Sequence, residues 1–190
     1  VLGREEMLCS GDQLMVVKNN YSLTAAEKDP TAPPFIANGD RCRVGRVRAI
    51  RELYGFSFAE ARLVFPDYDD YEIETTVLLS TLTSEAPALV REDQERLYQA
   101  VMADYADLPR KADRMVQLRK DKHFNALQIK YGYAITCHKA QGGQWAHVYL
   151  DQGYMTDEML GADYIHWLYT AFTRATEKLY LVNWPQSQTE

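Results

Sequence analysis

The residues best suited to chemistry lie in residues 133–145, whose sequence is YAITCHKAQGGQW. An apolar run leads into Thr136, His138 and Lys139, and the pair Gly142-Gly143 follows. Paired glycines let a backbone approach a ligand closely, and main-chain N–H groups at a helix start bind anions. The segment therefore suits the phosphate oxygens of a nucleotide or of a nucleic-acid backbone. Taken alone, His138 is more often a surface or capping residue.

A second candidate segment, residues 167–174 with the sequence WLYTAFTR, follows after a short gap. The pattern predicts a helix from Tyr164 to about Arg174, capped by Asp163. Apolar strands are predicted at residues 147–150 and 178–182, and the second, KLYLV, lacks alternation, as in a strand buried on both faces of a parallel sheet. A further strand is expected at YAI. Because α/β proteins bind ligands at the carboxyl ends of their strands, we expect both candidate segments there.

Residues 10–82 show short strand patterns separated by turn signals. Alternation predicts strands in the run that ends at Asn19 and at residues 35–36, 41–53, 57–65 and 72–79. The Asn38-Gly39 step predicts a hairpin, and Gly45 marks a bulge. Five short strands in about 70 residues are typical of a small antiparallel barrel.

The strand predicted at residues 41–53 is rich in arginine. Alternate residues of a strand share a face, so Arg41 lies with Arg43, and Arg46 with Arg48. Two interpretations are equally supported. The arginines either solvate an edge strand and block its aggregation, or they contact a nucleic-acid backbone.

Residues 83–125 are helical in pattern. Leu97, Val101 and Tyr105 are spaced four apart and form one apolar stripe with Tyr98 and Met102. A second, basic segment covers residues 111–122. We interpret it as a solvated helix face in preference to a nucleic-acid contact.

The composition bounds the class of protein. A net charge of −6 and a pI near 5.3 argue against coating duplex nucleic acid by bulk charge, but leave room for a local basic groove. Three separated cysteines indicate neither a disulfide framework nor a metal site, which suits a cytoplasmic protein. Neither a membrane span nor a signal peptide is indicated. The start at Val1 is read either as a boundary inside a larger protein or as a processed terminus.

The two candidate segments, YAITCHKAQGGQW and WLYTAFTRATEKLYLV, resemble motifs V and VI of superfamily 1 DNA helicases of the RecD-like branch, which includes the exodeoxyribonuclease V alpha subunit. The start of the barrel region, GDQLMVVKNNY with FIANGD, resembles the SH3-like barrel inserted in such helicases. The resemblance implies an α/β fold, with residues 1–9 and 126–190 in the second RecA-like motor domain. Residues 10–82 would be the SH3-like insert and residues 83–125 a helical insert.

The resemblance also implies roles for individual residues. Arg174 would be the catalytic arginine finger, and Gly142 and Gln144 would bind nucleotide with it. Thr136, His138 and Lys139 would contact single-stranded DNA, with Arg46 and Arg48 as further DNA-binding candidates. ATP and Mg²⁺ would be required, with the Mg²⁺ ligands outside this chain. Thr170 and Thr173 would orient the Arg174 loop.

Two features limit these roles. Related helicases carry serine, an acid and phenylalanine where this chain has Gly143, Gln144 and Trp145, so the charge that would bind a ribose hydroxyl is missing. No GxxxxGK[ST] occurs, so we expect this chain alone neither to hydrolyse ATP nor to unwind DNA, and to need a P-loop motor domain. Helicase–nuclease subunits are further expected partners. The alternatives are a binding module without ATPase activity that uses the barrel arginines, and a degenerate helicase scaffold.

Overall fold

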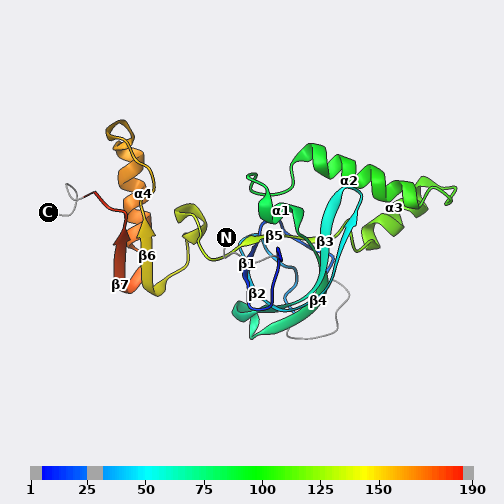
Figure 1. The fold of residues 1–190 in the computed structure, drawn as a ribbon, viewed down its shortest axis with the longest axis horizontal. Coiled ribbons are helices and arrows are strands. Elements are labelled where there is room, and N and C mark those ends of the chain that lie inside the picture. Colours follow the sequence, from blue (N-terminus) through cyan, green and yellow to red (C-terminus); the bar gives the residue numbers. More distant parts are fainter. Residues whose placement is uncertain (1–5, 25–31, 186–190) are drawn as a thin grey trace. The chain divides into compact units, whose positions relative to one another are not determined.

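The computed structural model describes residues 6–24 and 32–185 of the chain, which form two compact units within residues 1–133 and 134–190 (Figure 1). Among the described residues, the first unit combines a barrel with α-helices, and the second combines two strands with one α-helix. The predicted α/β class with a barrel and a helical segment is therefore confirmed. No helix of the described residues is long and apolar enough to cross a membrane.

Five strands close the barrel of the first unit in the order β1-β2-β3-β4-β5. Neighbouring strands are antiparallel except β4 and β5, which are parallel. The predicted bulge is present, because the β2–β3 register shifts between Val44 and Arg46. Gly39 adopts a φ of +105° in the predicted Asn38-Gly39 turn. The strands are β1 (Gln13–Val16), β2 (Arg41–Leu53), β3 (Phe56–Phe65), β4 (Tyr71–Leu78) and β5 (Leu127–Tyr131).

The fifth barrel strand is not where the sequence pattern put it. Ile36 forms only an isolated bridge with Asn20, whereas β5 pairs with both β1 and β4. Leu127 and Ile129 of β5 are fully buried in the barrel core. The boundary expected at residue 126 therefore differs from that of the compact unit, which extends to Tyr133. The physical reason is that β1 and β4 would otherwise leave unpaired edges.

The helical segment lies between β4 and β5 in the chain. It comprises α1 (Ser80–Thr83), α2 (Arg91–Asp104) and α3 (Lys111–Lys120). Outside this segment, the 3-10 turn η1 (Pro66–Tyr68) connects β3 to β4. Leu97 and Val101 of α2 are buried with Leu118 of α3 against Phe58 of the barrel. The predicted apolar stripe of α2 is thus confirmed. It forms a second core cluster between the helices and β3, so the helices are part of the barrel unit.

A hydroxyl and an imidazole fasten the helices to the β2–β3 hairpin. The Tyr54 hydroxyl at the hairpin tip donates to Asp104 at 2.5 Å. The His123 ring meets the rings of Tyr54 and Phe58 edge-on, with centroids 5.9 and 5.1 Å apart. Burial lowers the pKa of His123 below its ordinary 6.5, and the nearby Asp121 carboxylate opposes this shift.

This shift predicts a pH-dependent loss of stability. The unfolded chain holds the His123 proton more tightly than the folded one, so its stabilising contribution is present above pH 6.5. That contribution is lost as the pH falls from 6.5 towards the lowered pKa. When the pH is lowered from about 8 to about 5, we expect the free energy of unfolding of His123→Gln to fall by less than that of wild type. Urea unfolding at both pH values measures this difference. Equal losses in the two proteins would contradict the assignment.

The second unit contains a parallel strand pair covered by one helix. Strands β6 (Trp145–Asp151) and β7 (Ala175–Val182) run parallel in register His147↔Lys178 to Asp151↔Val182, which confirms the predicted parallel pair. The helix α4 (Ala162–Phe172) connects them. Two 3-10 turns complete the unit, η2 (Cys137–Ala140) and η3 (Asp157–Met159).

Three local predictions for this unit are wrong. Residues 133–136 form no strand, because no described strand pairs with them. The N-cap of α4 is Gly161, and Asp163 lies one residue inside the helix, where its charge still faces the positive helix end. β7 is not buried on both faces within the described residues, since Tyr180 and Leu181 are 37% and 40% exposed. Two strands and one helix are too few to cover a parallel sheet.

Candidate functional site

The first candidate segment folds into the short 3-10 turn η2. Thr136 precedes it with extended backbone angles, and its hydroxyl accepts a hydrogen bond from the Lys139 N–H at 3.4 Å. This N-cap closes the turn and leaves the side chains of His138 and Lys139 exposed. The backbone of Thr136 is thus fixed while the two neighbouring side chains remain accessible to a ligand.

The two glycines after this turn are needed for different reasons. Gly142 has a φ of +84°, and the space that a Cβ would occupy is open. It therefore shapes the turn and allows a ligand to approach the backbone closely. A Cβ on Gly143 would lie 2.5 Å from the Trp145 indole. The glycine and the tryptophan are therefore a matched pair. A side chain at position 143 would therefore collide with the Trp145 ring as it is placed here.

Arg174 is held by main-chain oxygens of both candidate segments. Its Nε donates to the Thr170 carbonyl at 2.8 Å, and one terminal nitrogen donates to the Gly143 carbonyl at 2.8 Å. That nitrogen also reaches the Ala140 carbonyl at 3.4 Å, and the other donates to the Thr173 hydroxyl at 2.9 Å. The fork of donors thus fixes the guanidinium against the glycine loop. The Thr173 hydroxyl thus contacts the guanidinium that it is expected to orient.

The amide of Gln144 makes a second link between the segments. Its Nε2 donates to the Thr173 carbonyl at 3.3 Å, and the Trp145 N–H donates to the Arg174 carbonyl at 2.9 Å. A carboxylate in place of Gln144 has no proton to donate to that carbonyl. Gln144 therefore makes a hydrogen bond to the Thr173 carbonyl that the acid of the family pattern could not make.

The site lies at the opposite end of the strands from the one predicted. Arg174 directly precedes β7, and Gly142 and Gln144 precede β6. These residues consequently gather at the amino ends of the parallel pair. The expectation of carboxyl ends was wrong because Arg174 follows a helix and not a strand.

An open pocket of about 630 Å³ lies beside the turn η2. His138 lines it together with one face of α4, on which Asp163, Trp167 and Thr170 recur at helical spacing. Cys137 also lines it, and its thiol contacts the Trp167 carbonyl. Burial raises the pKa of Cys137 more than the nearby Arg174 lowers it, so the thiol is a poor nucleophile. Sequence reasoning missed this pocket, although the spacing on α4 was its available signal.

The two barrel arginines belong to the first unit and differ in their surroundings. Arg48 pairs with Glu74 at 2.5 Å, both about half exposed, and such surface pairs contribute little to stability. Arg46 lies directly across from Arg62 in the β2–β3 register, and Arg62 pairs with Glu72 at 3.0 Å. β1 covers only Arg41–Arg43 of β2, so both arginines lie where β2 has no second neighbour among the described strands.

No cluster of three or more histidine, cysteine or acidic side chains within residues 6–24 and 32–185 could hold a metal ion.

Comparison with known families supports the resemblance. Residues 131–182 match the UvrD-like helicase C-terminal domain, well under half of the 190 residues. A search of curated proteins gives no match. The matched range contains Thr136, Gly142 and Arg174 together, so the C-terminal region is similar to the C-terminal domain of superfamily 1 helicases.

Proposed function

We propose that this chain is the C-terminal part of an ATP-dependent DNA helicase of the RecD-like branch. The observation that carries the proposal is the guanidinium of Arg174 bonded to the carbonyls of Ala140 and Gly143 within the helicase-like region. It joins the two helicase-like segments in one site. The predicted direction, 5′ to 3′ along single-stranded DNA, comes only from the RecD-like resemblance.

Arg174 would serve an ATP site shared with a P-loop motor domain. A fixed guanidinium stabilises the charge that develops on a transferring phosphoryl group. The open space at Gly142 allows phosphate oxygens to approach the loop backbone, so the residues present fit that ligand. To reach a phosphate, Arg174 must exchange carbonyl partners for phosphate oxygens. Mg²⁺, which neutralises phosphate charge when bound, would be held by the P-loop domain.

The same loop would connect ATP to DNA. Thr136, His138 and Lys139 would contact the single strand, and Ala140 follows them directly. Release of the Ala140 and Gly143 carbonyls by Arg174 would free the end of η2, so the phosphate state would change the grip on DNA. Such coupled loop movements are the expected basis of translocation.

The test is ATP hydrolysis by the protein that carries this chain together with its P-loop domain. We expect single-stranded DNA to stimulate hydrolysis and a duplex with a 5′ overhang to be unwound in preference to one with a 3′ overhang. Absence of stimulation would contradict the helicase proposal. Preference for the 3′ overhang would contradict only the RecD-like direction.

A second candidate function is nucleic-acid binding by the barrel without ATPase activity. The exposed Arg46 favours it, because it lies where β2 has no second neighbour among the described strands and a phosphate can reach its guanidinium. Its signature is salt-sensitive binding of single-stranded DNA with no DNA-stimulated hydrolysis.

A further inference from the structure

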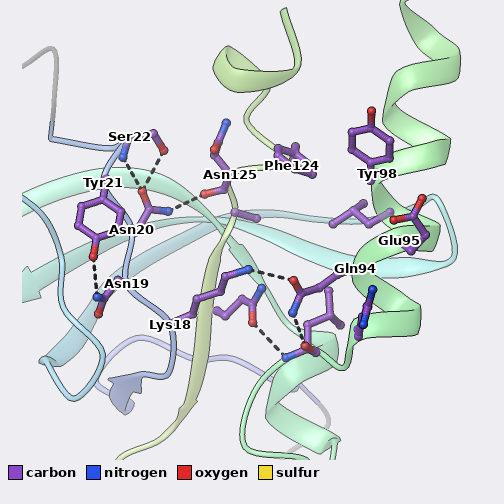
Figure 2. Close-up of a pocket in the computed structure, with 15 residues that line it drawn as sticks. Lys18, Asn19, Asn20, Tyr21, Ser22, Gln94, Glu95, Tyr98, Phe124 and Asn125 are labelled. Atoms are coloured by element: carbon purple, nitrogen blue, oxygen red, sulfur yellow. Dashed lines mark hydrogen bonds between the residues drawn. The ribbon is translucent and has the colours of Figure 1, made fainter. Parts of the chain in front are cut away.

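A groove of about 450 Å³ opens in the first unit between the loop after β1 and the helix α2 (Figure 2). Residues 18–22 form one wall, the first two turns of α2 form the other, and residues 124–128 form the floor. Buried Leu89, Leu97 and Ala126 make its base apolar. The helicase-like segments contribute nothing to it, since all its lining residues precede residue 134.

The walls of the groove are held in place by side-chain amides. Asn20 accepts from the Ser22 and Leu23 N–H groups and donates to the Asn125 carbonyl at 2.9 Å. Gln94 accepts from the Lys18 ammonium at 3.3 Å and donates to the Leu89 carbonyl. These bonds join the loop, the floor and the helix (Figure 2). The groove is therefore preformed, which lowers the entropic cost of binding.

The same bonds limit what the groove can recognise. Asn19 is also engaged, since it accepts from the Asn38 N–H and donates to the Tyr21 hydroxyl. An extended peptide needs main-chain donors and acceptors from its site, and the amides here already bond to the protein itself. The chemistry that remains for a ligand is aromatic surface and positive charge.

Both kinds of group line the groove. The aromatic rings come from three separate segments, and Tyr21 is 63% exposed while it packs on Phe35 at 5.0 Å. Phe124 and Tyr98 meet edge-on at 6.2 Å. Lys18 and Arg91 supply the cations, and Glu95, the single carboxylate among the described lining residues, accepts from Gln99 at 2.6 Å.

We infer that this groove binds a short stretch of single-stranded nucleic acid, with bases stacked on its aromatic rings and phosphates on Lys18 and Arg91. Stacking faces combined with cations bind single strands with little base preference. The inference rests on the proposed function and extends it, because it adds a second strand contact outside the helicase-like region. It also assigns a role to the helical segment, which supplies one wall.

The test is fluorescence anisotropy with the whole chain and a labelled thymidine oligonucleotide of about ten nucleotides. Tyr21→Ala is expected to weaken binding about fivefold to tenfold, because it removes a stacking face. Tyr21→Phe keeps the ring and should bind as wild type does. The control Tyr154→Ala removes an 85% exposed tyrosine of the second unit and should have no effect.

The phosphate contacts are tested by salt titration. Lys18→Ala with Arg91→Ala should reduce the slope of log affinity against log salt by about 1.4, because each phosphate contact on a single strand contributes about 0.7. Arg110→Ala with Lys111→Ala removes equal charge from exposed positions and should leave the slope unchanged. Cross-linking of an iodouracil oligonucleotide should label residues 18–22 or 124–128.

The inference that the groove binds a single strand would be overturned if Tyr21→Ala and the Lys18→Ala, Arg91→Ala double variant bound DNA with wild-type affinity. Cross-links confined to residues 134–185 would overturn it as well. Neither result would contradict the helicase proposal. Groove variants that lose binding of a peptide but keep DNA affinity would likewise overturn the inference. Failure of the helicase proposal is seen separately, as hydrolysis that DNA does not stimulate.

Discussion

Replacing Arg174 by alanine is expected to lower DNA-stimulated ATP hydrolysis by the full-length protein by about a thousandfold. The side chain makes four hydrogen bonds from three of its nitrogens, and the proposed function has it exchange carbonyl partners for phosphate oxygens. A guanidinium placed at the developing phosphoryl charge acts mainly on the turnover rate and less on substrate affinity. Steady-state kinetics would therefore show a fall in kcat with a smaller change in KM.

Two further variants separate charge from geometry. Arg174→Lys keeps the positive charge but cannot bond simultaneously to Gly143 and Thr170 through a planar fork, so most of the loss should persist. Arg110→Ala removes an exposed arginine from the connection between α2 and α3 and should retain full activity. Near-normal hydrolysis in Arg174→Ala would refute the arginine-finger role. A circular-dichroism spectrum like that of wild type would show that the loss is not due to unfolding.

Replacing Ile129 by alanine is expected to lower the free energy of unfolding of the barrel unit by about 2–5 kcal/mol. Ile129 is fully buried in β5, in the same core cluster as Leu14 and Leu63. The substitution removes apolar contacts and leaves a cavity between strands that are distant in sequence. Urea unfolding followed by far-ultraviolet circular dichroism measures the loss.

Ile50 of β2 provides a matched control. The same substitution there removes the same atoms from a side chain that is 46% exposed, so the loss should be below about 1 kcal/mol. Tryptophan fluorescence is unsuitable, because Trp145, Trp167 and Trp184 all lie in the other unit. Similar losses at Ile129 and Ile50 would show that β5 does not close the barrel in solution.

Local patterns in the sequence were sufficient for elements whose neighbours are close along the chain. β2, β3 and β4 follow one another through short turns, so alternation and turn residues predicted them nearly to the residue. The apolar stripe of α2 was equally visible, since helical spacing reports a buried face directly.

β5 shows why other features were beyond reach of the sequence. Leu14 pairs with Tyr131 across more than a hundred residues, and no local pattern reports such a pairing. The expected boundary at residue 126 placed this strand with the C-terminal region, whereas it pairs with β1 and β4. The same applies to the groove, whose walls come from residues 18–22, α2 and residues 124–128.

By itself the sequence determined the kinds of elements, the candidate residues and the helicase-like pattern that includes Arg174. Only the tertiary structure decided that β5 closes the barrel, that the site lies at the amino ends of β6 and β7, and that Arg48 is paired with Glu74. The physical reason is range. Propensity and periodicity act over one or two turns of chain, whereas strand closure and carbonyl-to-guanidinium contacts depend on segments that only packing brings together.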